Sequence, residues 1–276
     1  MTRKQKRGLH TKFAQIIFEN MTWIDTHAHL YVSAFEADYP LAVQRALDGG
    51  VDKIMLPNIN VESLPDVISL SAAYPHQIFP MIGLHPCDVK ADWEIQLSLL
   101  LKQMNDAHFV GIGETGIDLY WDKSTLEWQK QAFIQQIGWA IQYNKPIIIH
   151  ARESMKIILE IIEQHWSQSL SGIFHCFSGD QEDLDRVVSL QNFKIGIGGT
   201  LTYKNNELPK LLKKEHLPYI VLETDSPYLP PVPHRGKRNE SSYIPLIGEA
   251  LSNVLAIPIE NIAQITTKNA IEIFQL

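Results

Sequence analysis

The sequence has few cysteines, no long apolar run and no excess of basic residues. Its 276 residues include two cysteines, Cys87 and Cys176, which excludes a disulfide framework and a four-thiolate zinc site. No apolar run approaches the roughly 20 residues that a transmembrane helix needs. These absences predict a cytoplasmic protein that contacts no membrane, and no sequence feature indicates an obligatory protein partner.

The charge balance of the chain is acidic, with a formal net charge of −7 at pH 7. A nucleic-acid-binding protein of this composition needs local positive charge, from a few Lys and Arg side chains or from bound metal. Basic residues gather in residues 1–21, directly before the first predicted strand. We interpret this segment as a basic N-terminal extension that is a disordered tail, a misassigned start or a functional arm. Residues 22–276 are predicted to form one folded domain.

Short apolar runs alternate with longer amphipathic stretches along the chain. Runs without strict polar alternation are typical of parallel strands that are buried on both faces. We expect about eight strands of this kind, at residues 23–24, 53–56, 78–82, 109–112, 146–149, 172–174, 193–197 and 219–222.

The amphipathic stretches between these runs predict helices. The clearest is 124–143, where Ser124 and Glu127 have the spacing of a capping box. Further helices are expected at residues 153–165, 180–190, 205–215, 241–255 and 259–275. Repeated strand–helix alternation implies parallel strands with right-handed crossovers. The sequence therefore predicts a single-domain α/β fold, a (β/α)₈ TIM barrel, with an open doubly wound sheet as the alternative.

Most of the predicted strands end in residues that bind metals. Side chains alternate along a strand with period two, so Asp25, His27 and His29 share one face. In a parallel barrel the carboxyl ends of the strands meet at one rim, where enzyme sites lie. A lone histidine at a strand end is more often structural, but burying many ionisable groups together requires compensating cations. The proposed ligands are His27, His29, Glu114, His150, His175 and Asp225.

This ligand set exceeds what one ion needs and suits two divalent cations per subunit. We expect Glu114 to bridge them, with the ligands of the first and last strands around one ion and those of the fifth and sixth around the other. Such a pair activates a water for hydrolysis, and Asp225 is placed to accept the proton of that water. Mixed nitrogen and oxygen ligands do not distinguish Mg, Mn, Zn, Co or Ni.

A proline-rich basic loop, residues 230–239, follows the last predicted strand. It contains Arg235, Lys237 and Arg238. TIM barrels often bind phosphate near their last two strands, and the arginine fork matches phosphate. The loop is therefore either a phosphate clamp centred on Arg235 or a solvated basic surface.

Taken together, these motifs resemble the TatD family of metal-dependent hydrolases, a branch of the amidohydrolase-like barrels. The resemblance spans residues 22–276, and its motifs are highly specific in combination. They are residues 25–29 (DTHAH), 83–86 (GLHP), 113–118 (GETGID), 146–152 (PIIIHAR), 175–179 (HCFSG), 222–228 (LETDSPY) and 235–240 (RGKRNE).

The resemblance implies a TIM barrel with a dinuclear metal site that hydrolyses ester bonds. Family members are described as deoxyribonucleases, some with 3′–5′ exonuclease activity, and some relatives as D-aminoacyl-tRNA deacylases. The six proposed ligands fall on the family's metal positions, and His85 and Arg152 fall near the substrate. DNA is then the expected substrate. A carboxyl-ester or amide hydrolase and a non-catalytic metal-binding scaffold are the alternatives.

Overall fold

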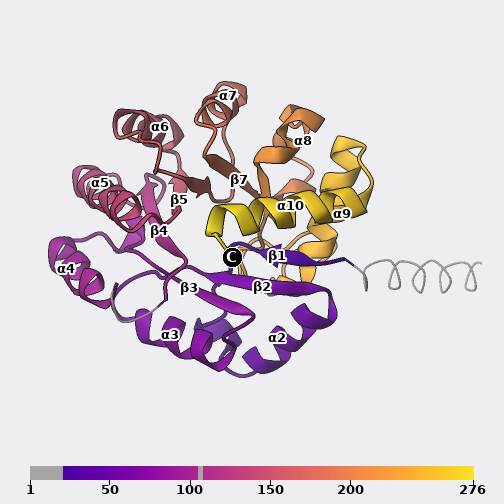
Figure 1. Cartoon of the computed structure of the whole chain (residues 1–276), viewed down its shortest axis with the longest axis horizontal. Coiled ribbons are helices and arrows are strands. Elements are labelled where there is room, and N and C mark those ends of the chain that lie inside the picture. Colours follow the sequence, from indigo (N-terminus) through magenta and orange to yellow (C-terminus); the bar gives the residue numbers. More distant parts are fainter. Residues whose placement is uncertain (1–20, 105–107) are drawn as a thin grey trace, which may run out of the picture.

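Eight parallel strands pair in chain order to form one sheet, which curls into a nearly closed barrel (Figure 1). The computed structural model describes residues 21–104 and 108–276. The strands are β1 (Trp23–Asp25), β2 (Val51–Leu56), β3 (Ile78–Ile82), β4 (Gly111–Asp118), β5 (Ile147–Arg152), β6 (Gly172–Phe174), β7 (Phe193–Ile197) and β8 (Ile220–Leu222).

The segments that follow β1 and β8 join the two ends of the sheet. The backbone N–H of Thr26 donates to the carbonyl of Leu222 at 3.0 Å, and that of Asp225 donates to His27 at 2.9 Å. Ala28 and Ser226 form a further parallel bridge. These contacts place the residues after the first and last strands side by side, although almost 200 positions separate Thr26 from Leu222.

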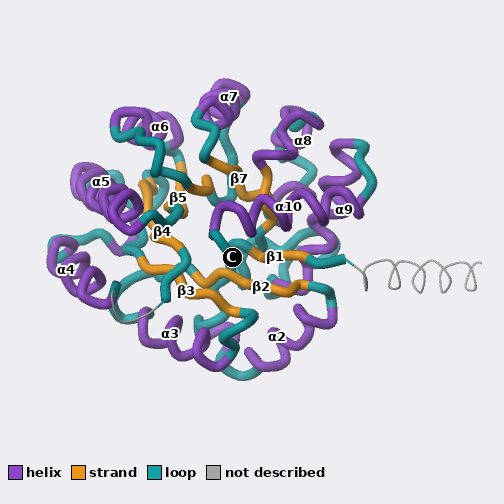
Figure 2. Tube along the Cα trace, in the orientation of Figure 1, coloured by secondary structure: helices purple, strands orange, loops and turns teal. Residues whose placement is uncertain are grey.

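Helices surround the strands on the outside of the barrel (Figure 2). They are α2 (Tyr39–Asp48), α3 (Leu64–Ala73), α4 (Trp93–Gln103), α5 (Leu126–Tyr143), α6 (Met155–Gln164), α7 (Gln181–Ser189), α8 (Leu208–Leu211), α9 (Ile244–Leu255) and α10 (Ile259–Phe274). The described residues also form five short 3₁₀ helices: η1 (Ser33–Phe35), η2 (Pro86–Asp88), η3 (Gly199–Thr202), η4 (Lys214–Tyr219) and η5 (Ser241–Tyr243).

Two separate apolar clusters stabilise the barrel. The larger one lies between the strands and the surrounding helices and includes Trp23, Phe133 and Phe174. The smaller one lies inside the barrel, where one residue from each of six strands meets the last turns of α10. Its buried members are Ile24, Met55, Met81, Ile148, Ile173, Val221, Ala270, Ile273 and Phe274. Burial on both faces explains why the strands are continuous apolar runs.

The small cluster closes one end of the barrel. Ile148 precedes His150 in β5 and Ile24 precedes His27, so the apolar side chains lie nearer the amino ends of the strands than the polar ones. Helix α10 packs against this end, with the C-terminus near the centre of the ring (Figure 1). The polar side chains that follow the strands therefore lie at the opposite end of the barrel.

The predicted TIM barrel is confirmed, but several predicted elements were wrong in detail. Strand β4 runs on to Asp118, because it pairs with β5 as far as Arg152. The predicted helix at 205–215 is only α8 and the first residues of η4, because Pro209 lies in the first turn of α8 and the backbone is extended at Leu212. Ser124 does not cap α5: the cap residue is Thr125, and the Ser124 hydroxyl donates to Asp122 instead.

Helices α2, α3 and α4 were not predicted from the sequence. The predicted extension lies outside the described residues except for Met21, which is already buried in the larger apolar cluster. Across residues 21–104 and 108–276, no single helix is long and apolar enough to cross a membrane; only the bent pair Ser241–Leu255 and Ile259–Phe274 together reaches that length and composition.

Candidate metal centre

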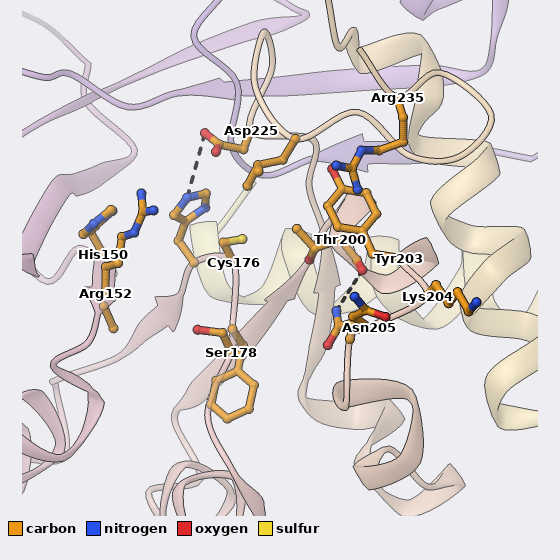
Figure 3. Close-up of a pocket in the computed structure, with 15 residues that line it drawn as sticks. His150, Arg152, Cys176, Ser178, Thr200, Tyr203, Lys204, Asn205, Asp225 and Arg235 are labelled. Carbon is orange, nitrogen blue, oxygen red and sulfur yellow. Dashed lines mark hydrogen bonds and ion pairs between the residues drawn. The ribbon is translucent and has the colours of Figure 1, made fainter. Parts of the chain in front are cut away.

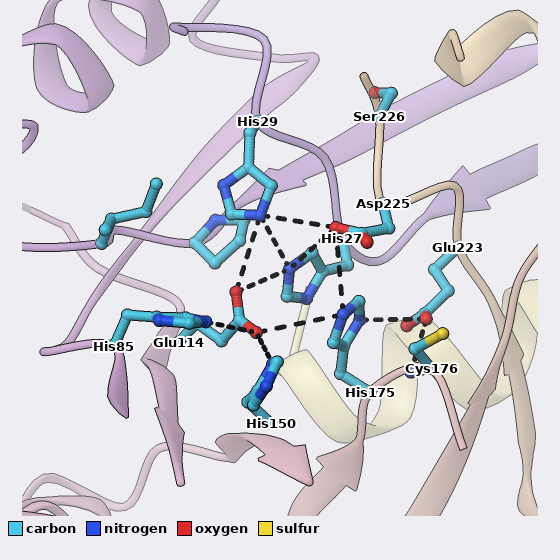
Figure 4. A network of polar contacts seen from close by, with 12 residues as sticks. His27, His29, His85, Glu114, His150, His175, Cys176, Glu223, Asp225 and Ser226 are labelled. Carbon is cyan, nitrogen blue, oxygen red and sulfur yellow. Dashed lines mark hydrogen bonds and ion pairs between the residues drawn. The ribbon is translucent and has the colours of Figure 1, made fainter. Parts of the chain in front are cut away.

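All six predicted ligands converge at the carboxyl ends of the strands (Figure 4). His27 and His29 follow β1, Glu114 lies within β4 and His150 within β5, His175 follows β6, and Asp225 follows β8. All six side chains are less than a fifth exposed and four are almost fully buried. The barrel therefore brings together groups that the sequence places up to 198 positions apart.

One oxygen of Glu114 faces the histidines that follow β1. Glu114 Oε2 lies 3.1 Å from His27 Nε2 and 3.5 Å from His29 Nε2. Asp225 Oδ1 approaches the same two nitrogens, at 3.9 Å from His27 and 3.5 Å from His29. His27, His29, Asp225 and Oε2 of Glu114 thus surround one small space.

The other oxygen of Glu114 faces a second set of histidines. Glu114 Oε1 lies 2.9 Å from His150 Nδ1, 3.4 Å from His85 Nε2 and 3.9 Å from His175 Nε2. His85 was expected near the substrate, and the structure brings it to the edge of the ligand cluster. Glu114 thus stands between two groups of nitrogen donors, with one oxygen directed to each.

The spacing of these donors fits bound cations. The Nε2 atoms of His27 and His29 lie 3.2 Å apart and point at each other. Ligands that bind one ion at about 2.0–2.2 Å stand roughly 3–3.5 Å apart, and imidazole nitrogens and carboxylate oxygens both bind transition metals. Two triads of donors around Glu114 have ligand atoms that all lie within 4.8 Å of one another: His27, His29 and Glu114, and His85, Glu114 and His150.

The electrostatics of the cluster favour a positive ligand. Burial opposes the charge of Glu114, but the surrounding His85, His27 and His150 rings hold the pKa of its carboxyl well below the usual range. Burial alone lowers the pKa of His175, but Glu223 and then Asp225 raise it to about 9. Glu114 and Asp225, whose carboxyl pKa values are lowered by the neighbouring histidines, thus stay charged in a buried site and stabilise cationic partners.

Other carboxylates and a phenol hold the far sides of the histidine rings. Glu223 Oε1 lies 2.9 Å from His175 Nδ1, Asp118 Oδ2 lies 2.8 Å from His150 Nε2, and the Tyr31 hydroxyl lies 2.9 Å from His29 Nδ1. Such partners fix the ring orientation of metal-binding histidines. Asp118 and Tyr31 were not singled out from the sequence. Asp118 could have been, since it is four residues after Glu114 on the same strand.

A cavity of about 630 Å³ opens beside the ligand cluster (Figure 3). His150, His175 and Asp225 line one side of it. Arg152 and Arg235, both predicted to bind substrate, line it at opposite ends (Figure 3). Each guanidinium stacks on an aromatic ring, that of Arg152 on Tyr120 at 3.9 Å and that of Arg235 on Tyr203 at 3.8 Å.

The other basic residues of the loop after β8 do not line the cavity. Arg238 donates to both carboxylate oxygens of Asp38, at 2.6 and 2.8 Å, and to Glu240 at 2.7 Å. Arg45 in α2 binds the same two carboxylates. Arg238 therefore anchors the loop to the barrel, while Arg235 faces the cavity and Lys237 is exposed.

A TIM barrel with histidine and carboxylate donors clustered at the carboxyl ends of its strands defines the class of metal-dependent hydrolases. Residues 24–275 match the family model described as TatD related DNase. The chain belongs to the TatD family of metal-dependent hydrolases.

Three similar proteins illustrate this membership. The uncharacterized metal-dependent hydrolase YabD of Bacillus subtilis is 35% identical over 254 residues, covering 91% of this chain and 98% of that protein. The 3′–5′ ssDNA/RNA exonuclease TatD of Pectobacterium atrosepticum is 31% identical, covering 91% and 99%. The crystal structure of YjjV, a TatD homologue of Escherichia coli, superposes with a TM-score of 0.86 at 29% identity, covering 92% and 98%.

Proposed function

We propose that this protein is a divalent-metal-dependent phosphodiesterase that removes nucleotides from the 3′ end of single-stranded DNA. The observation that carries the proposal is the position of Glu114, whose two oxygens face separate groups of imidazole nitrogens. A carboxylate in this position can bridge two ions, and two-metal sites are suited to phosphodiester hydrolysis.

In this proposal each ligand has a defined task. His27, His29 and Asp225 hold one ion, His150 and His175 hold the other, and Glu114 binds both. When bound, divalent cations supply Lewis acidity and a water that is deprotonated near neutral pH. Asp225 is 15% exposed and, of the three residues that hold the first ion, it is the one that lines the cavity, so its carboxylate can accept a proton from a water there.

The substrate-binding roles belong to the residues around the cavity. The Arg235 and Arg152 guanidinium groups are suited to phosphate oxygens, and the His85 ring lies close enough to the cluster to contact the scissile phosphate. A cavity of about 630 Å³ is in the usual range for one small ligand. The relative from Pectobacterium named as an exonuclease supports this choice of substrate.

The test is a comparison of nucleic acids and esters as substrates. Purified protein is incubated with 5′-labelled single-stranded DNA, single-stranded RNA, duplex DNA, an aminoacyl-tRNA and a lactone, each with Mg, Mn, Co, Ni or Zn. We expect single-stranded DNA to be shortened one nucleotide at a time from its 3′ end. Glu114→Gln should lose this activity and bind less metal, while its circular dichroism spectrum stays unchanged.

Other outcomes would contradict the proposal in distinct ways. Turnover of the aminoacyl or lactone ester without release of nucleotides would instead identify a carboxyl-ester hydrolase, such as a D-aminoacyl-tRNA deacylase. Retention of stoichiometric metal without turnover of any ester would identify a metal-binding scaffold. Equal activity of Glu114→Gln and the wild type would remove the bridging role.

A further inference from the structure

Two large aromatic side chains are exposed on the loop between β4 and α5. Tyr120 is 52% exposed and Trp121 is 70% exposed, and their rings meet edge to face with centroids 5.0 Å apart. Because these rings remain largely exposed to water, their burial contributes little to the stability of the fold. Exposed aromatic surfaces often bind partners or ligands.

A buried hydrogen-bond network holds this loop in place. Asp118 Oδ1 accepts hydrogen bonds from the backbone N–H groups of Tyr120 at 2.9 Å and Trp121 at 3.1 Å. The buried Gln129 side chain in α5 binds the backbone N–H and carbonyl of Asp118, at 2.8 and 3.2 Å, and the carbonyl of Asp122. The two aromatic rings are therefore presented to solvent by an ordered loop.

The same aspartate connects the aromatic pair to the metal centre. The second oxygen of Asp118 lies 2.8 Å from the ring of His150, one of the proposed ligands. The guanidinium of Arg152 lies over Tyr120 at 3.9 Å and near Trp121 at 5.8 Å, and it lines the cavity next to His150. Arg152 lies at the end of the cavity away from Arg235 (Figure 3), and the aromatic pair that contacts Arg152 therefore adjoins that end.

We propose that Tyr120 and Trp121 form a stacking surface for the bases of a single-stranded nucleic acid whose scissile phosphate lies at the metal centre. This inference rests on the proposed function and specifies how the strand is held. Aromatic rings bind successive bases by stacking, with little dependence on sequence, and a neighbouring arginine adds attraction to the backbone. In a chain of net charge −7, Arg152 provides this positive charge locally.

The two ends of the cavity then have different tasks. The Tyr203 and Arg235 end is enclosed by the segments after β7 and β8 and takes the 3′-terminal nucleotide. The Tyr120 and Trp121 surface is open and takes the nucleotides that precede it, so a strand of any length extends into solvent. The enzyme therefore needs at least one base beyond the terminal nucleotide for tight binding.

The experiment compares three variants of the full-length protein. Trp121→Ala removes the most exposed ring, and Trp121→Phe retains a surface for stacking. Trp166→Ala is the matched control, because Trp166 is 49% exposed but lies between α6 and β6, at the other end of the barrel. Binding of a fluorescent single-stranded oligonucleotide with phosphorothioate linkages is measured by anisotropy, and cleavage of the normal oligonucleotide is measured in parallel.

We expect Trp121→Ala to weaken binding and kcat/KM about 5- to 150-fold, the usual effect of losing one base stack. Trp121→Phe should retain most of the affinity, and Trp166→Ala should match the wild type. Cleavage of the nitrophenyl ester of thymidine 5′-monophosphate, which has no second base, should be unchanged in all three variants. An abasic site at one of the two nucleotides before the 3′ end should weaken binding to the wild type but not to Trp121→Ala.

Two outcomes would overturn the stacking surface. One is equal oligonucleotide binding by Trp121→Ala and the wild type; the other is an equal effect of the abasic site on both proteins. If the wild type cleaves no oligonucleotide with any metal, the proposed function itself fails. The two failures are therefore distinguishable.

Discussion

Oε1 of Glu223 lies 2.9 Å from Nδ1 of His175 and also accepts a hydrogen bond of 2.7 Å from the backbone N–H of Cys176. This contact turns the other nitrogen of His175 towards Glu114 and Asp225, each at 3.9 Å. Glu223 is 1% exposed, and a Cβ atom at Gly196 would overlap its second oxygen. The glycine in β7 thus leaves the space that the carboxylate occupies.

Glu223→Gln should weaken metal binding without unfolding the protein. The amide no longer attracts the imidazole proton of His175, and loss of such a partner typically lowers metal affinity or activity about 10- to 100-fold. Isothermal titration of the metal-free protein with Zn or Mn measures the change. Glu249→Gln, on the exposed side of α9, is the control and should bind metal normally.

Gly196→Ala examines the same contact from the neighbouring strand. The added methyl group displaces the Glu223 carboxylate, so this variant should lose metal affinity as Glu223→Gln does. If both variants bound metal as tightly as the wild type, the Glu223–His175 contact would have no role in holding the ion.

Arg235 and Arg238 should have separable effects, although three positions separate them. Arg235→Ala should reduce kcat/KM for phosphodiesters about 10- to 100-fold, the effect of losing a charged hydrogen bond. Its melting temperature should stay unchanged, because Arg235 stacks on Tyr203 at the surface of the cavity. Steady-state kinetics with a phosphodiester and with a neutral ester measure this selectivity.

Arg238→Ala should instead destabilise the protein, because Asp38 and Glu240 lose one of their two charged partners and keep only Arg45. Thermal denaturation reports this loss as a lower melting temperature. A normal melting temperature for Arg238→Ala would contradict the anchoring role of Arg238. An equal decrease in kcat/KM of Arg235→Ala for neutral esters and for phosphodiesters would contradict the phosphate role of Arg235.

Asp25 should make the stability of the metal-free protein depend on pH. Burial raises the pKa of its carboxyl to about 7 from 3.8, even though Thr224 and the backbone of His27 donate hydrogen bonds to it. The folded state then binds the proton more tightly than the unfolded state. The free energy of unfolding should therefore fall as pH rises from about 4 to about 7, by on the order of 4 kcal/mol.

Urea denaturation in EDTA between pH 4 and pH 8 measures this dependence. The histidines of the metal centre also titrate in this range, so the wild type is compared with Asp25→Asn, which cannot ionise at this position. The decrease should be smaller in the variant by the contribution of Asp25. Parallel curves for the two proteins would show that the Asp25 carboxyl has an ordinary pKa when folded.

The convergence of the six proposed ligands could be predicted from the sequence because strand ends in a parallel barrel share one rim. His27, Glu114 and Asp225 each follow or end an apolar run, so their convergence follows from the topology alone. The partition of Glu114 between two histidine groups could not be predicted in the same way, because it depends on side-chain torsions. In the structure each Glu114 oxygen faces one histidine group, and a bridge between two ions at this carboxylate stays a prediction.

The loop residues were harder to interpret. Arg235 and Arg238 look equivalent in sequence, but only coordinates show that Asp38, 200 positions away, binds Arg238. Tyr120 and Trp121 were not singled out from the sequence, because the loop that exposes them is held by hydrogen bonds of Asp118 and Gln129. The helix predicted at 205–215 was misplaced because amphipathic spacing alone does not show that α8 begins at Leu208, next to Pro209, and ends at Leu211.

Helix α10 and the apolar cluster inside the barrel determine by which side substrate and product can enter and leave the site. Phe274 and its apolar neighbours fill the barrel at the amino ends of the strands, so no channel runs through the barrel to that end. Whatever enters past Arg152 and Arg235 must leave by the same mouth. A bound product would therefore block the entry of the next substrate until it had left.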